Sequence, residues 1–66
     1  MYKEAIESFE KAIKLNPTSN VYKLKASVHT KLNENDKAVK SYMNALALDP
    51  DDQDSRCKMN DILDKF

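Results

Sequence analysis

Two single residues, His29 and Cys57, carry the side chains best suited to metal binding or covalent chemistry. A metal site needs several ligands at set spacing, and no second His or Cys lies one helical turn away from either residue. A nucleophilic thiol needs an adjacent base, and His29 is far from Cys57 in the sequence. We therefore expect His29 to pack between helices and Cys57 to be a small, semi-buried residue.

Four aspartates, Asp49, Asp51, Asp52 and Asp54, form an acidic cluster that could suggest a calcium site. An EF-hand loop needs a glycine and a terminal glutamate, and the chain has no glycine at all. Acidic residues at the start of a helix are already explained by the helix dipole. The lack of glycine also excludes phosphate-cradling loops and dinucleotide fingerprints. We expect no metal, no cofactor and no catalysis.

The length and charge narrow the function further. The chain has 66 residues, 11 basic and 11 acidic, and a formal net charge of zero. A domain of this size buries only about 60% of its unfolded surface, which argues against an enclosed active site. Neutrality argues against a nucleic-acid or membrane-surface binder. The longest apolar run, residues 45–48, is far shorter than a membrane span, and no apolar leader follows Met1, so we expect a cytoplasmic protein.

The apolar periodicity predicts one all-α domain over residues 1–66, with helices at about 2–15, 20–32, 36–48 and 52–65. Pro17 and Pro50 end the first and third helices, and Asn33 suits a left-handed turn after the second. The predicted N-cap residues are Thr18, Ser19 or Asn20 for the second helix, Asn35 or Asp36 for the third, and Asp51 or Asp52 for the fourth. The second helix carries an apolar stripe of Val21, Leu24, Val28 and Leu32, and the fourth is apolar on one side through Met59, Ile62, Leu63 and Phe66.

The two prolines also mark an internal repeat. They are 33 residues apart, and residues 2–17 share five identities with residues 35–50. Both copies have the spacing Ala-x3-aromatic-x2-Ala-x4-Pro, carried by Ala5, Phe9, Ala12 and Pro17 and again by Ala38, Tyr42, Ala45 and Pro50. Small alanines let two helices approach closely while the aromatic ring fills the gap between neighbours.

This pattern resembles helix B of the tetratricopeptide repeat (TPR) family. Tyr22, Ala26 and His29 occupy the bulky, small and aromatic positions of its helix A. The resemblance implies antiparallel helical hairpins, as a fragment of an α-solenoid. The order would be one helix B, one complete A–B hairpin and a C-terminal capping helix.

The resemblance implies a protein-interaction scaffold that holds a peptide or a partner helix in the groove lined by its A helices, without catalysis. The polar stripe expected to line this groove is Asn20, Lys23, Ser27, Thr30 and Lys31, joined by Arg56 and Asn60 of the fourth helix. Its basic residues suit an acidic partner through charge-assisted hydrogen bonds, although the same stripe also fits a solvated helix face. The carboxylate clamp of TPR co-chaperones is not matched, because Leu24 stands where the clamp has Asn.

Two alternatives to a peptide-binding module remain open. The first helix has no A helix to cover Tyr2, Ile6, Phe9 and Ile13, so the chain could be a structural unit that forms a stacked or swapped homodimer. It could equally be an engineered or truncated repeat fragment without a ligand of its own.

Overall fold

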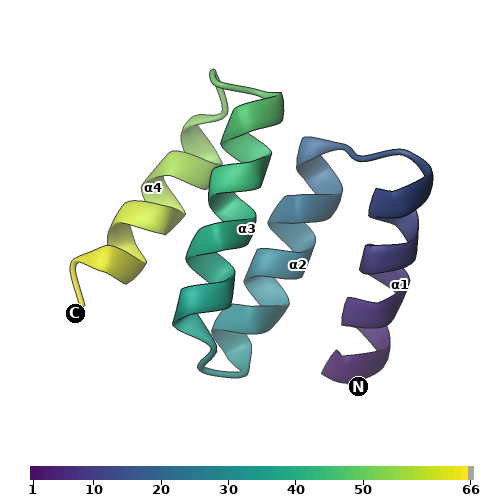
Figure 1. The fold of residues 1–66 in the computed structure, drawn as a ribbon. Coiled ribbons are helices and arrows are strands. Elements are labelled where there is room, and N and C mark those ends of the chain that lie inside the picture. Colours follow the sequence, from purple (N-terminus) through teal and green to yellow (C-terminus); the bar gives the residue numbers. More distant parts are fainter. Residues whose placement is uncertain (66) are drawn as a thin grey trace.

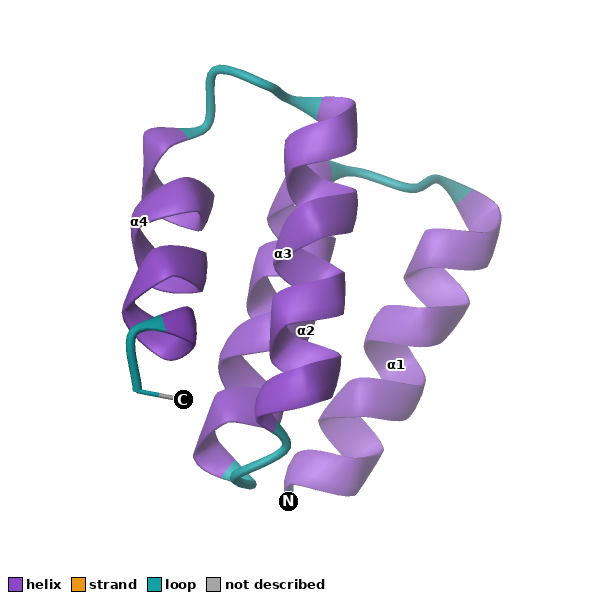
Figure 2. Cartoon of the chain, turned by 60° about the vertical axis from the view of Figure 1, so that its left-hand side comes forward, coloured by secondary structure: helices purple, strands orange, loops and turns teal. Residues whose placement is uncertain are grey.

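The computed structural model describes residues 1–65 as four helices joined by short turns (Figure 1). They are α1 (Tyr2–Leu15), α2 (Ser19–Lys31), α3 (Asn35–Leu48) and α4 (Gln53–Leu63). Successive helices run antiparallel and pack on their neighbours in chain order, in a flat arrangement of 31 × 27 × 13 Å (Figures 1 and 2). The predicted all-α class is confirmed, whereas the expectation for Phe66 lies outside the described residues.

The helices begin and end within two residues of the predicted positions because local signals fix their ends. Thr18 has an extended backbone, and its hydroxyl oxygen accepts a hydrogen bond from the Val21 N–H at 3.3 Å. Asp52 accepts hydrogen bonds from the Ser55 N–H at 3.3 Å and from the Ser55 hydroxyl at 2.8 Å. The predicted caps of α2 and α4 are thus confirmed at Thr18 and Asp52.

The turn between α2 and α3 differs in part from the prediction. Asn33 adopts the predicted left-handed backbone, with φ of 62°. The expected cap at Asn35 or Asp36 is wrong, because α3 already begins at Asn35 and its N-cap residue is Glu34. Glu34 makes no side-chain cap, since its carboxylate is turned to His29 and Lys37 instead.

The core lies where α2, α3 and α4 meet. Ala26 and Ala38 are fully buried, Tyr42 is 3% exposed, and Ile62 of α4 joins the same cluster. The alanines allow close approach of α2 and α3, and the Tyr42 ring fills the remaining space. The residues of the A–B hairpin that the pattern predicts to pack include Ala26, Ala38 and Tyr42, and also Ala45, which is fully buried.

The first helix packs much less completely. Ala5, Phe9 and Ala12 are only partly buried, and α1 has no buried residue, although the matching residues of α3 are covered. The reason is that α1 packs on α2 alone, whereas α3 lies between α2 and α4. The repeated sequence therefore occupies two different environments.

Three of the expected burial assignments are wrong. Leu24 is 52% exposed, Leu63 is 47% exposed, and Cys57 is exposed rather than semi-buried. Leu24 departs from its stripe because α1 and α3 cover other sides of α2, and α4 is covered only on the side that meets the core. The exposure of Leu24 matters for the site described below.

Candidate functional site

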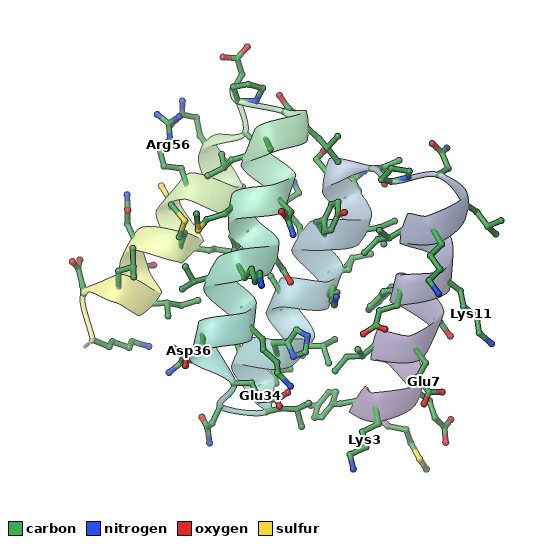
Figure 3. The ribbon with its side chains drawn as sticks, viewed as in Figure 1. Lys3, Glu7, Lys11, Glu34, Asp36 and Arg56 are labelled. Carbon is green, nitrogen blue, oxygen red and sulfur yellow. The ribbon has the colours of Figure 1, made fainter. Side chains whose placement is uncertain are left out.

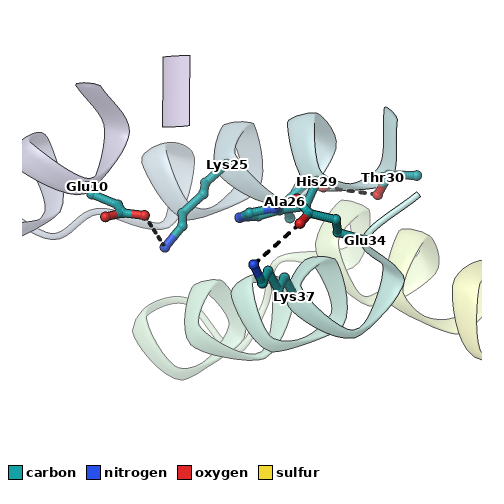
Figure 4. Close-up of polar contacts among 7 residues, drawn as sticks. All are labelled: Glu10, Lys25, Ala26, His29, Thr30, Glu34 and Lys37. Atoms are coloured by element: carbon teal, nitrogen blue, oxygen red, sulfur yellow. Dashed lines mark hydrogen bonds and ion pairs between the residues drawn. The ribbon is translucent and has the colours of Figure 1, made fainter. Parts of the chain in front are cut away.

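On α2, some of the residues expected to line the groove have side chains available for a ligand, whereas others already bond to another residue of the chain. Asn20 and Lys31 are exposed, and Ser27 is partly buried without a hydrogen-bonded partner among residues 1–65. The Thr30 hydroxyl is already in use, because it donates to the Ala26 carbonyl at 2.9 Å (Figure 4). The Lys31 ammonium lies 6.0 Å from the centre of the Tyr2 ring, at the outer limit of a cation–π contact.

Lys23 is also engaged, at the start of α4. Its ammonium lies 3.3 Å from the Asp52 carboxylate, whose side chain is only 7% exposed. The hydrogen bonds from Ser55 lower the pKa of Asp52, and Lys23 lowers it further against the opposing effect of burial. Lys23 thus ties α2 to the cap of α4, in addition to any role at a surface.

Arg56 and Asn60 lie on another side of the molecule from the α2 residues. The N-cap residues of α2 and α4, Thr18 and Asp52, are 34 residues apart, so α2 and α4 can be aligned with this offset. In that alignment Arg56 corresponds to Tyr22, and Asn60 corresponds to Ala26. Tyr22 and Ala26 belong to the side of α2 that meets α3. Figure 3 accordingly shows Arg56 at the outer edge of α4, where it donates to the Pro50 carbonyl at 3.3 Å.

A concavity of about 700 Å³ lies between α1 and α3 with α2 as its floor. It is called the second groove below, to distinguish it from the groove that the sequence predicts along the A helices. Ile6 and Leu32 supply apolar surface, and charged side chains of both signs surround it, including Lys3 and Glu7 of α1 (Figure 3). Its lining residues come from α1, α2 and α3, so no local sequence motif could predict it. It forms only when α1 and α3 lie on either side of α2 in the folded chain.

A small polar network, drawn in Figure 4, is among the residues that line this second groove. His29 is 5% exposed, and its Nδ1 lies 3.0 Å from a Glu34 carboxylate oxygen. The Lys37 ammonium donates to the other Glu34 oxygen at 3.3 Å. The hydrogen bond with His29, aided by Lys37, lowers the pKa of Glu34. His29 is therefore a buried packing residue, as predicted, and it also has a polar partner that the sequence reading missed.

Residues 1–65 contain no cluster of three or more His, Cys, Asp or Glu side chains that could hold a metal ion. None of the helices described here has the length and apolar character that crossing a membrane requires.

Comparison with known proteins places this arrangement in a family. The tetratricopeptide repeat profile matches residues 1–19 and 20–52, so its second unit spans α2 and α3 as one helix pair. Searches of curated proteins and of solved structures found no match. Repeats of this family generally mediate protein–protein interaction, and its members are typically non-catalytic scaffolds. The matched residues cover most of the chain, which therefore belongs to the tetratricopeptide repeat family.

Proposed function

We propose that the chain is a protein-interaction module that binds an acidic segment of a partner protein along one face of α2. This surface, called the α2 face below, consists of Asn20, Leu24, Ser27 and Lys31, with Lys23 at its edge. The observation that carries the proposal is the exposure of Leu24, at 52%, in a line of polar side chains of which Asn20 and Lys31 are also exposed.

The composition of α2 supports an acidic partner. Residues 19–31 include three lysines and no acidic residue, in a chain whose formal net charge is zero. Lys31 can form charge-assisted hydrogen bonds with a carboxylate, and Asn20 and Ser27 can bond to a peptide backbone. Burial of Leu24 against an apolar partner side chain would supply the non-directional part of the affinity.

The choice of test variant depends on which lysines of α2 already form contacts within the chain. Reversing Lys23 would also break its pair with Asp52, so lost binding could reflect a disturbed α4. Lys31→Glu avoids that problem, because Lys31 contacts only the exposed ring of Tyr2. Leu24→Ser is a second variant that removes apolar surface without changing charge.

The measurement is fluorescence anisotropy with a labelled peptide that alternates acidic residues and leucine. Lys31→Glu and Leu24→Ser should each weaken binding about tenfold at low salt, with unchanged helix content. The matched control is Lys40→Glu, which makes the same charge reversal on α3 beside the second groove. Binding that is lost in the control but kept in the two α2 variants would overturn the assignment.

A second candidate function is self-association, and one observation favours it. The helix α1 has no buried residue, although the matching residues of α3 are buried. Association through α1 uses a surface other than the α2 face, so the two functions are compatible. Cytoplasmic location remains a prediction from the sequence.

A further inference from the structure

The outer surface of α1, together with Met1 directly before it, carries a regular line of exposed and partly buried side chains. Met1, Ala5, Ser8, Ala12 and Leu15 follow one another at spacings of 4, 3, 4 and 3 residues, and they are called the α1 seam below. This spacing keeps the four residues within α1 on one side of the helix, with Met1 at its start, and is the pattern by which two helices pack along their length. Met1 is 92% exposed and Leu15 is 88% exposed, the two highest values among the exposed large hydrophobic residues.

The corresponding surface of α3 shows how such side chains pack when another helix covers them. In α3 the residues matching Ala5, Ser8 and Ala12 are Ala38, Ser41 and Ala45, which are 0%, 4% and 0% exposed. They lie against a neighbouring helix at close range because their side chains are small. The α1 seam has the same small centre, so it can accept a helix equally closely.

The charges beside the seam indicate which helix fits. Glu4 and Lys11 each directly precede a seam alanine, so both lie on the same edge of the seam, one in each half of α1. Neither residue forms an ion pair within residues 1–65. If a second α1 runs antiparallel, with a two-fold axis between Glu7 and Ser8, Glu4 of each copy lies beside Lys11 of the other.

The alternative arrangements fit less well. A two-fold parallel pair would place Glu4 and Lys11 of one copy at the opposite edge of the interface from those of the other, so neither charge would find its partner. The helix α4 of a second copy carries Arg56 and Asn60 where α2 has Tyr22 and Ala26, so it lacks the small, apolar surface that covers α3. The antiparallel arrangement also brings Met1 of one copy close to Leu15 of the other.

We propose that the 66-residue chain forms a two-fold symmetric dimer through the α1 seam, with Glu4 and Lys11 paired across the interface. The occupant of this surface is a second copy of the same chain. The α1 seam and the α2 face share no residue, so different variants test the dimer and the proposed ligand.

Sedimentation equilibrium on the chain and its charge variants tests the interface. Glu4→Lys and Lys11→Glu each turn two attractive pairs into two repulsive ones, and each should raise the dimer dissociation constant by about tenfold or more at low salt. Lys14→Glu is the matched control, because it makes the same change in the same part of α1 on the opposite, solvated side. An equimolar mixture of the Glu4→Lys and Lys11→Glu chains should form a heterodimer, since opposite charges face each other again.

Cross-linking gives a second readout that does not depend on charge. In a Cys57→Ser background, Ser8→Cys lies next to the two-fold axis and should form a disulfide-linked dimer under mild oxidation. Glu7→Cys, one residue away on the solvated side, should not. A chain that is monomeric throughout the concentration range overturns the proposal. So does a dimer that is equally weakened by Lys14→Glu, or one that cross-links equally through both cysteines.

Discussion

The unequal burial of the two repeated aromatic residues leads to a quantitative prediction about stability. Phe9 and Tyr42 occupy the same position in the two copies, but Tyr42 is 3% exposed whereas Phe9 is only partly buried. Truncating a fully buried aromatic side chain costs about 3–5 kcal/mol of unfolding free energy. A chain of this length has roughly 3–10 kcal/mol in total, so Tyr42→Ala should remove most of its stability.

Phe9→Ala should cost less, about 1–2 kcal/mol, because its side chain is only partly buried and a smaller cavity forms. For a domain of this size, that loss corresponds to a fall of about 5–15 °C in the thermal midpoint. Urea unfolding followed by circular dichroism measures both losses, at a concentration where the wild-type chain is monomeric. Tyr42→Phe is the control that keeps the ring. Equal losses at Phe9 and Tyr42 would refute the reasoning, because they would mean that α1 is packed as completely as α3.

Three further predictions concern the helix ends and the buried phenol. The pKa of Asp52 is lower in the folded chain than its unfolded value of about 3.8, so its carboxylate stabilises the fold above that pH and this stabilisation is lost as the pH falls below it. In an acid titration, the stability of Asp52→Asn should therefore change less with pH than that of the wild type. Burial, aided by the Asp54 carboxylate, raises the pKa of Tyr42, so stability should fall as the pH rises above about 10, and Tyr42→Phe should remove that loss in an alkaline melt. Asn33→Gly should leave the thermal midpoint unchanged or slightly raised, whereas Asn33→Val should cost about 1–2 kcal/mol, because only the former tolerates the left-handed backbone.

The features that the sequence predicted well are those that depend on neighbours in the chain. The positions of Pro17 and Pro50, the capping side chains Thr18 and Asp52, and the left-handed Asn33 each act within a few residues. Helix number, type and ends could therefore be predicted before any packing was known. The alanine and aromatic spacing added the pairing of α2 with α3.

The features that it missed depend on contacts between distant residues. The pair of Lys23 with Asp52 joins residues 29 positions apart, and its geometry follows from how α4 folds back. The same holds for the concavity between α1 and α3, whose lining residues come together only in the folded chain. Sequence similarity between the repeats also concealed the exposure of α1, because identical residues at Ala5 and Ala38 have different neighbours.

The order of contacts along the chain has a consequence for how the molecule folds. The three most extensively packed pairs of helices are adjacent in sequence, and the core lies chiefly between α2 and α3, with α4 added through Ile62. Local pairing of this kind favours rapid folding, because little chain entropy is lost before contacts form. The α2–α3 hairpin should act as the nucleus on which α4 and then α1 assemble, so its backbone amides should exchange with solvent deuterium most slowly. In the free chain the amides of α1 should exchange first, which makes its ordering a step that a binding partner can control.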